Sequence, residues 1–273
     1  MVNFARAGDD SSPGQRLDDG VPQRLWALVA LARHRLLLLD YDGTLAPFHT
    51  NRLEARAPEG LLELLARIRD GAGTTLAIVS GRPVAEVTAL VGDLGVTIVG
   101  EHGWEMRTPD GQLVQRPLGH GVTAALDQAR DAARRAGSEE MLERKRSALV
   151  LHVRGLPEDE ARARVADVRG PWGAAALRAG LVLDEIDGGL ELRARGRDKG
   201  TATLSLLSQA PAGTLAVFVG DDVTDEDAFA VVSDFGFGVR VGPGEQPSMA
   251  AGRLPSCEDV PAFLERWLQV TGR

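Results

Sequence analysis

Four short segments of the 273-residue chain carry the side chains best suited to chemistry: Asp40-Tyr41-Asp42-Gly43-Thr44, Ser80-Gly81-Arg82, Lys199 and Gly220-Asp221-Asp222. Asp40, Asp42 and Asp221 offer carboxylate oxygens, which are the ligands that a hard divalent cation such as magnesium prefers. Without a cation, so many carboxylates at one site would repel one another, and some would take up protons. These residue types therefore predict a magnesium site.

The same segments hold groups suited to phosphate chemistry. The hydroxyl of Ser80 or Thr44 and the ammonium of Lys199 can bind phosphate oxygens and offset developing charge. A carboxylate can act as a covalent nucleophile and form an aspartyl-phosphate, which divides one difficult displacement into two steps. Asp42 can protonate a leaving alcohol and then activate water. The set as a whole indicates a magnesium-dependent phosphatase.

Each segment taken alone also has a purely structural explanation. Asp-x-Asp-Gly is common at turns and strand ends, Lys199 alone would be a solvated cation, and the acids between Asp221 and Asp227 could simply begin a helix. Their occurrence in this order, each at an expected strand end or helix start, favours a shared site. Other catalytic patterns are missing: Lys199-Gly200-Thr201 lacks the glycine loop of a P-loop, and Ser80 lies in no Gly-x-Ser-x-Gly elbow.

Alternating elements place these segments at one edge of a sheet. Short apolar runs predict buried strands over residues 36–39, 75–79, 96–99 and 215–219, the last of them being the final strand. Helices are expected over residues 59–70, 83–90 and 198–208. In open parallel sheets, ligands bind beyond the carboxyl ends of the strands, where the polar segments begin. The pattern predicts an α/β fold with a doubly wound, Rossmann-like core.

The alternation is interrupted in the middle of the chain. Residues 104–117 contain the hairpin signal Pro109-Asp110-Gly111, and helices over 123–136 and 157–168 accompany short strands at 147–154 and around Gly188-Gly189. We therefore expect an inserted α+β cap domain at residues 104–194, and a core formed by residues 21–103 and 195–273. The first 20 residues, rich in Asp, Ser, Pro and Gly, are expected to be a mobile tail.

Composition narrows the possible partners. The 31 Lys and Arg residues against 39 Asp and Glu residues give a net charge of −8, and aromatic residues make up only 4%. Neither favours nucleic-acid binding. The sequence contains no run of about 18 apolar residues, so it predicts no membrane-spanning helix. The one cysteine, Cys257, is consistent with the cytoplasm. We expect no nucleic-acid or membrane partner and a monomer, although no motif addresses the oligomeric state.

The segment Leu38-Leu39-Asp40-Tyr41-Asp42-Gly43-Thr44-Leu45 resembles the first motif of the haloacid dehalogenase superfamily of phosphatases. Ser80, Lys199 and Gly220-Asp221-Asp222 fall where its other motifs would, and the insert resembles its larger α/β cap. The resemblance implies that Asp40 is the nucleophile and Asp42 the general acid and base. Magnesium would be held by Asp40, the backbone carbonyl of Asp42 and Asp221, with Asp222 and Asp225 in or near the metal site.

Within that superfamily, the chain from Leu36 onward resembles the trehalose-6-phosphate phosphatase family. The likeness rests on the following segments: Val79-Ser80-Gly81-Arg82, Gly100-Glu101-His102-Gly103, Glu143-Arg144-Lys145, Leu151-His152-Val153-Arg154, Leu190-Glu191-Leu192-Arg193 and the ten residues from Gly220 to Phe229. It implies that Gly81, Arg82, Glu101 and His102 contact the substrate and that Glu143, Lys145 and Glu191 bind sugar hydroxyls, for which carboxylates are strong acceptors.

Some of these residues keep alternative interpretations. Glu143-Arg144-Lys145-Arg146 could be a charged surface, and Glu101 and His102 could either join cap and core or be plain loop residues. The favoured hypothesis is hydrolysis of trehalose 6-phosphate. The alternatives are another sugar phosphate, such as that of sucrose, glucosylglycerate or mannosylglycerate, and a non-catalytic sugar-phosphate sensor. A sensor has no need of a nucleophile, so the complete set Asp40, Asp42, Lys199 and Asp221 argues against it.

Overall fold

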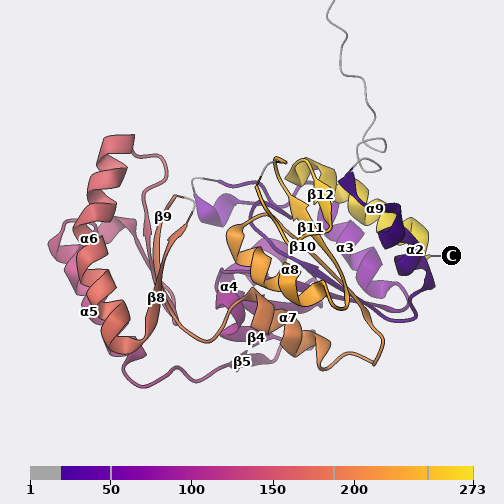
Figure 1. The fold of residues 1–273 in the computed structure, drawn as a ribbon, viewed down its shortest axis with the longest axis horizontal. Helices are drawn as coiled ribbons and strands as arrows, with labels where there is room; N and C mark the ends of the chain where they lie inside the picture. The colour runs from indigo at the N-terminus through magenta and orange to yellow at the C-terminus, as the bar shows by residue number, and fades with distance from the viewer. Residues whose placement is uncertain (1–19, 50, 187, 245, 273) are drawn as a thin grey trace, which may run out of the picture. The chain divides into compact units, whose positions relative to one another are not determined.

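The computed structural model describes residues 20–49, 51–186, 188–244 and 246–272 (Figure 1). The predicted mobile tail falls almost wholly on residues 1–19, outside the described residues. The chain divides into two compact units, each treated separately below. The first comprises Met1–Pro47, Ala57–Leu76 and Leu206–Arg273, and the second Phe48–Arg56 and Ala77–Ser205. The core and cap boundaries expected from the sequence stay a prediction.

The first unit is built on parallel strands. Strands β1 (Arg35–Leu39), β10 (Leu215–Gly220), β11 (Gly236–Val241) and β12 (Gly252–Leu254) pair in the order β12-β11-β10-β1. The first three residues of β2 (Thr74–Val79) also belong to this unit. Every residue of β1 and β10 is buried, as expected for continuous apolar runs that are covered on both faces.

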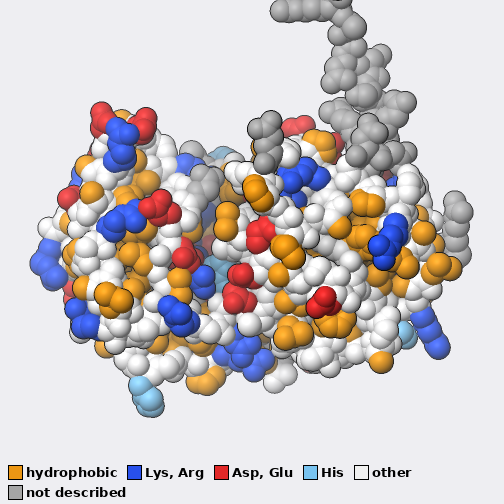
Figure 2. Space-filling view, viewed as in Figure 1, with side chains coloured by type: hydrophobic (Ala, Val, Ile, Leu, Met, Phe, Trp, Pro, Cys, Tyr) orange, Lys and Arg blue, Asp and Glu red, His pale blue; other side chains and the backbone are white. Residues whose placement is uncertain are grey.

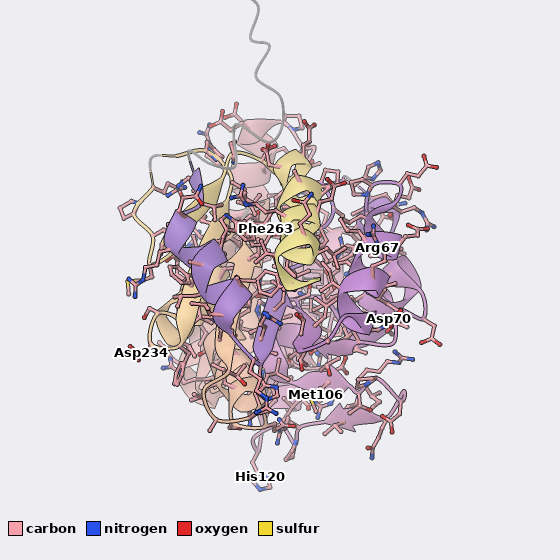
Figure 3. The ribbon with its side chains drawn as sticks, turned by 90° about the vertical axis from the view of Figure 1, so that its right-hand side faces the viewer. Arg67, Asp70, Met106, His120, Asp234 and Phe263 are labelled. Atoms are coloured by element: carbon pink, nitrogen blue, oxygen red, sulfur yellow. The ribbon has the colours of Figure 1, made fainter. Side chains whose placement is uncertain are left out.

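Helices cover these strands. Helix α8 (Glu226–Val232) packs against β10 and β11, while α2 (Gln23–Leu31) and α3 (Leu61–Asp70) pack against α9 (Val260–Thr271) on the other side (Figure 1). Phe263 lies on the side of α9 that faces α2 (Figure 3), where its ring centroid is 5.0 Å from that of Trp26. Short 3-10 helices precede α8 at Val223–Asp225 and α9 at Cys257–Asp259.

The second unit contains the rest of β2, followed by a parallel partner and an antiparallel hairpin. Strand β3 (Thr97–Gly100) pairs in parallel with β2, β4 (Glu105–Arg107) runs antiparallel to β3, and β5 (Leu113–Gln115) runs antiparallel to β4. Helix α4 (Val84–Val91) and the 3-10 turn η2 (Glu101–Gly103) flank these strands. The expected hairpin is therefore present, and it extends the ladder of β3.

A separate four-stranded antiparallel sheet lies in the same unit. Its order is β6 (Leu142–Arg144), β7 (Ala148–His152), β9 (Gly189–Ala194), β8 (Leu181–Ile186). Helices α5 (Val122–Arg135) and α6 (Glu158–Ala179) cover one face of it (Figure 1), burying a core that includes Leu126, Leu151 and Trp172. Acidic and basic side chains gather over the outer surface of α6 (Figure 2). Helix α7 (Lys199–Leu207) starts in this unit.

The fold class is confirmed: the molecule is α/β, with parallel and antiparallel strands in its larger sheet. Two expectations were wrong. The helix expected at residues 157–168 continues to Ala179 because Trp172, beyond Pro171, is buried and its indole Nε1 donates to the Ala129 carbonyl at 3.0 Å. Strand β10 is not the final strand, because β11 and β12 follow it. Among the described residues, no helix is both long and apolar enough to cross a membrane.

Candidate active site

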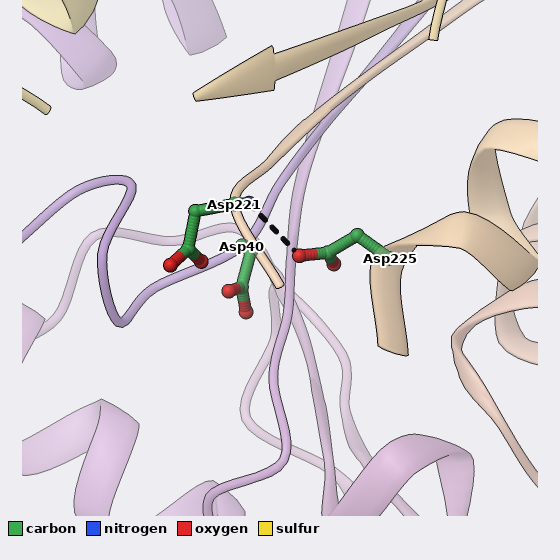
Figure 4. Close-up of side chains that lie close together, drawn as sticks. All are labelled: Asp40, Asp221 and Asp225. Atoms are coloured by element: carbon green, nitrogen blue, oxygen red, sulfur yellow. Dashed lines mark hydrogen bonds between the residues drawn. The ribbon is translucent and has the colours of Figure 1, made fainter. Parts of the chain in front are cut away.

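A cluster of three carboxylates lies at the carboxyl ends of β1 and β10 (Figure 4). The two strands are in register with Leu39 beside Val219, and the Asp40 N–H donates to the Val219 carbonyl at 2.9 Å. Parallel pairing in this register brings Asp40 and Asp221 to the same edge. One carboxylate oxygen from each of Asp40, Asp221 and Asp225 lies within 4.8 Å of the other two.

The turn after β1 closes tightly over this cluster. Gly43 has a φ of +71°, and a Cβ atom there would lie 2.0 Å from the Asp221 Oδ2 atom. The turn is held by a hydrogen bond of 2.8 Å from the Gly43 N–H to the Ala46 carbonyl and by an isolated bridge between Asp42 and Ala46. Asp42 is half-buried and Thr44 is buried, and among the described residues the Thr44 hydroxyl has no hydrogen-bond partner.

The loop after β10 is shaped by Asp222 and Asp225. The Asp225 carboxylate accepts hydrogen bonds from the Asp221 N–H at 3.0 Å and from the Asp222 N–H at 2.9 Å. The Asp222 carboxylate accepts from the Val223 N–H at 2.6 Å and so caps the short helix that follows. Asp225 thus fixes the backbone that carries Asp221, whereas the Asp222 side chain is engaged in capping.

The cluster fits a divalent cation. Asp40 and Asp225 are buried, and three ionised carboxylates so close together repel one another in a medium that screens poorly. A hard cation removes that repulsion and takes oxygen ligands of this kind. The tight approach of Gly43 to Asp221 leaves no room for a side chain in the turn.

In the second unit, the loop after β2 packs against the turn after β3. The Glu101 N–H donates to the Arg82 carbonyl at 2.8 Å and the His102 N–H to the Ser80 carbonyl at 3.1 Å, while the Ser80 hydroxyl accepts from the Arg82 N–H at 3.1 Å. Glu101 and His102 have φ angles of 46° and 55°, a left-handed conformation that is costly for residues other than glycine. Such strain persists only where surrounding contacts impose it.

The Glu101 carboxylate supplies several of those contacts. It accepts hydrogen bonds from the Arg146 N–H at 2.9 Å, from the Ser147 N–H at 2.6 Å and from the Ser147 hydroxyl. Gly81 leaves the space that the His102 ring occupies, because a Cβ atom at Gly81 would lie 2.8 Å from the ring. These contacts join the loops after β2 and β3 to the turn between β6 and β7.

One face of the four-stranded sheet is polar. Leu149 and Leu151 of β7 point into the helix-covered core, so Val150 between them faces the other way. Glu143 of β6 and Glu191 of β9 are both in register with Val150 and share that second face. Lys145, two residues after Glu143, follows the same alternation. The period of two thus gathers three of the predicted sugar-binding residues on one surface.

Glu191 is held by Lys145 and His102. The Lys145 ammonium lies 3.1 Å from its Oε1 atom and also donates to the Gly81 carbonyl at 3.1 Å, while the His102 Nε2 atom lies 3.4 Å from Glu191 Oε2. Burial alone would raise the pKa of Glu191, but the charges of Lys145 and His102 outweigh it and hold that pKa well below its usual range. Burial likewise opposes the charge on Lys145, yet Glu191 and Glu143 raise its pKa.

Glu143 belongs to a second charged network. Its Oε2 atom is 2.7 Å from His152 Nε2, and its Oε1 atom pairs with the Arg52 guanidinium. Arg52 also pairs with Glu86 at 3.0 Å. Burial would raise the pKa of Glu143, but the hydrogen bond from His152 and the charges of Lys145 and Arg52 lower it to about 2. Both carboxylates of the polar face are therefore ionised at neutral pH.

Lys199 is the first residue of α7. Its side chain is only 3% exposed, and its carbonyl accepts a hydrogen bond of 2.7 Å from the Thr203 hydroxyl. A buried ammonium is stable where negative groups compensate its charge. A lysine at the surface needs no such groups, because water solvates it. Lys199 is therefore not the solvated surface cation that it could have been from the sequence.

The predicted residues fall into two groups, one in each unit. The first holds Asp40, Asp42, Thr44, Asp221, Asp222 and Asp225, and the second Ser80, Gly81, Arg82, Glu101, His102, Glu143, Lys145, Glu191 and Lys199. The sequence analysis did not identify Arg52, Glu86 or His152 as site residues. Arg82, in the loop before α4, and Glu86, in the first turn of α4, form an ion pair at 3.7 Å, and their spacing of four residues was a usable signal for Glu86. No sequence pattern marked Arg52.

Comparisons with known proteins identify the family. The model of the trehalose-phosphatase family matches residues 38–255. The trehalose-6-phosphate phosphatase of Escherichia coli (strain K12) is 34% identical over 234 residues, which cover 83% of this chain and 84% of that protein. The range matched by the family model contains the acidic segments after β1 and β10.

Solved structures share the fold. The C-terminal domain of the trehalose-6-phosphate phosphatase of C. albicans superposes with a TM-score of 0.78 at 22% identity, over 93% of this chain and 98% of that one. A haloacid dehalogenase-like hydrolase from Bacteroides thetaiotaomicron gives a TM-score of 0.61 at 18% identity, over 85% and 99%. Together with the sequence matches, these findings lead to one assignment: the chain belongs to the trehalose-phosphatase family of phosphatases.

Proposed function

We propose that this phosphatase hydrolyses trehalose 6-phosphate to trehalose and inorganic phosphate, with magnesium bound at the acidic cluster. The observation that carries the proposal is the cluster of Asp40, Asp221 and Asp225 beyond two parallel strands, in a chain that matches the trehalose-phosphatase family over most of its length. The name of the E. coli relative supports the substrate.

The proposed reaction has two steps. In the first, a carboxylate oxygen of Asp40 attacks the phosphorus, the bond from phosphorus to the sugar oxygen breaks, and Asp42 gives its proton to that oxygen. In the second, Asp42 takes a proton from water as the water oxygen attacks the phosphorus. The bond from phosphorus to the Asp40 oxygen breaks, so inorganic phosphate leaves and the Asp40 carboxylate is restored. Half-burial suits Asp42 to this exchange, because its carboxyl can reach both solvent and substrate.

Other residues bind and neutralise the phosphate. Ser80, Thr44 and Lys199 are proposed to contact its oxygens, with Lys199 offsetting the charge that develops. Magnesium, held by Asp40, Asp221 and the carbonyl of Asp42, would supply the positive charge that lets an anionic ester approach a carboxylate nucleophile. Asp225 and Asp222 are proposed to hold the loop that carries Asp221, and so to act at the edge of the metal site.

The polar face of the four-stranded sheet is proposed to recognise the sugar. Glu143 and Glu191 are ionised acceptors for hydroxyl groups, and Lys145 is a donor beside them. Gly81, Arg82, Glu101 and His102 adjoin this face and are proposed to shape it. Residues 104–194 would then be a specificity cap inserted into a core of residues 21–103 and 195–273. A cytoplasmic, monomeric enzyme is part of the same proposal.

Metal removal tests the proposal. We expect the purified protein to release equal amounts of trehalose and phosphate from trehalose 6-phosphate in magnesium. A chelator should lower the rate by at least about a hundredfold, since a metal supplies several kcal/mol of charge stabilisation, and added magnesium should restore it. Magnesium should also raise the unfolding temperature, because it relieves the repulsion among the carboxylates. Undiminished turnover in chelator would refute the metal site.

A further inference from the structure

Arg52 lies between two acidic side chains that come from different parts of the second unit. It begins the short 3-10 helix η1 (Arg52–Glu54). Its guanidinium pairs with Glu143 of β6 through Nη1 and with Glu86 of α4 through Nη2, the latter at 3.0 Å. One arginine therefore bridges the four-stranded sheet and a helix that flanks the larger sheet.

The backbone around Arg52 is itself held in place. The Arg52 carbonyl accepts a hydrogen bond of 2.7 Å from the Arg82 guanidinium, which also lies 3.7 Å from Glu86. At the start of the same segment, the Arg154 guanidinium stands 4.6 Å from the centroid of the Phe48 ring. Anchors on both sides restrict where the Arg52 side chain can reach, which lowers the entropy lost when its fork engages Glu143.

Glu143 needs such a partner. Only 7% of its side chain is exposed, and burial without compensating charge drives a carboxyl towards its neutral form. The charged groups facing Glu143 are Arg52, His152, Lys145 and Glu86. Lys145 is committed to Glu191 at 3.1 Å, and Glu86 is itself acidic. Arg52 is thus the one permanently charged cation among these groups that pairs directly with Glu143.

The two carboxylates of the polar face differ in where their partners come from. The partners of Glu191, Lys145 and His102, are both residues that family resemblance assigns to the site. The arginine partner of Glu143 comes instead from the segment Phe48–Arg56, which carries none of the site motifs. A neutral Glu143 would present a hydroxyl donor on one oxygen, and it would be a weaker and less defined acceptor for sugar hydroxyls.

We propose that Arg52 is a positioning residue for sugar recognition: by its ion pair with Glu143 it keeps that carboxylate charged and fixed in orientation as the acceptor for a substrate hydroxyl. The inference rests on the proposed function, in which Glu143 binds the sugar. Arg52 acts through Glu143 and touches no reacting atom. It therefore controls the binding of sugar phosphates and leaves the phosphoryl-transfer step alone.

Steady-state kinetics on the full chain provide the first test. For Arg52→Gln, which keeps a planar polar group but removes the charge, we expect KM for trehalose 6-phosphate to rise about tenfold, the loss of roughly one charge-assisted hydrogen bond, with kcat within about twofold. Arg52→Lys should recover part of the loss. Hydrolysis of p-nitrophenyl phosphate, which has no sugar, should be unchanged in both variants.

The matched control is Arg162→Gln on α6, where an exposed arginine pairs with exposed Glu158 and Asp159. This variant loses the same charge and should hydrolyse both substrates with unchanged kcat and KM. An unchanged KM for trehalose 6-phosphate in Arg52→Gln would overturn the proposal. So would an equal loss on both substrates, because that result would show a merely structural role.

Titration of the Glu143 carboxyl tests the inference without any substrate. In protein with 13C-labelled glutamate carboxyls, the signal that is lost in Glu143→Gln identifies the residue. In wild type it should titrate near pH 2, and in Arg52→Gln its pKa should rise by at least about 1, since an adjacent cation lowers a carboxyl pKa by that much or more. An unshifted pKa overturns the role of Arg52. Failure of wild type to hydrolyse trehalose 6-phosphate would instead refute the proposed function.

Discussion

Replacing Asp40 by Asn is expected to lower phosphate release by at least about a thousandfold while leaving the fold intact. An amide is isosteric with the carboxylate but cannot form the phosphoryl bond that the proposed first step requires. The backbone hydrogen bond from Asp40 to Val219 does not involve the side chain and is retained. The substitution also removes one of three close negative charges, so in chelator the unfolding temperature should be equal to wild type or higher.

Asp234→Asn is the matched control for this change. Asp234 is exposed in the first unit (Figure 3), and it has no part in the acidic cluster. The Asp234→Asn variant carries the same chemical change as Asp40→Asn and should retain full activity. Turnover of Asp40→Asn within a few fold of wild type, measured by phosphate release in magnesium, would show that Asp40 is not the nucleophile.

A methyl group added at Gly43 is expected to abolish most of the activity although no catalytic side chain is replaced. The Cβ of Gly43→Ala would lie 2.0 Å from Asp221 Oδ2, so the turn or the carboxylate must move. A displacement of about 1 Å in a catalytic group costs on the order of a hundredfold in rate. We therefore expect kcat to fall by at least about a hundredfold, and the magnesium concentration needed for half-maximal activity to rise.

Gly213→Ala separates this steric effect from backbone strain. Gly213 has a φ of +79°, close to the +71° of Gly43, but nothing lies within 4 Å of the position its Cβ would take. Gly213→Ala should lose about 1 kcal/mol of stability, the cost of a left-handed alanine, and Gly43→Ala should lose more because its clash with Asp221 adds to that cost. Only Gly43→Ala should lose activity. If both variants kept normal kcat, the close approach of Gly43 to Asp221 would have no part in catalysis.

The elements nearest the site could be predicted because their signals are local. Leu36–Leu39 and Leu215–Val219 are apolar runs closely followed by acidic residues, and they form β1 and β10 with Asp40 and Asp221 directly beyond the strand ends. The alternation of Glu143 and Lys145 likewise places both on one face of a strand and the turn that follows it. Such patterns depend on a few neighbouring residues and on burial, both of which are visible in the sequence.

The features that could not be predicted depend on contacts between distant residues. Strand β11 contains Gly236 and Gly238, which weaken its strand pattern, yet Gly238 is needed because a Cβ there would lie 2.7 Å from the Phe229 ring. Helix α6 passes through Pro171 because Trp172 is buried beyond it. Arg52 meets Glu143 across 91 positions of sequence (143 − 52 = 91), and no local pattern marks such a pair.

The most direct test of the account is a comparison of kcat/KM across phosphate esters under identical magnesium conditions. Trehalose 6-phosphate should be hydrolysed with a kcat/KM at least about a hundredfold above that of glucose 6-phosphate. Only the disaccharide has a second sugar ring, whose hydroxyls can form hydrogen bonds with the polar face of the four-stranded sheet. Sucrose, glucosylglycerate and mannosylglycerate phosphates should also fall well below it. Equal values for trehalose 6-phosphate and glucose 6-phosphate, or a higher value for another ester, would contradict the proposed substrate.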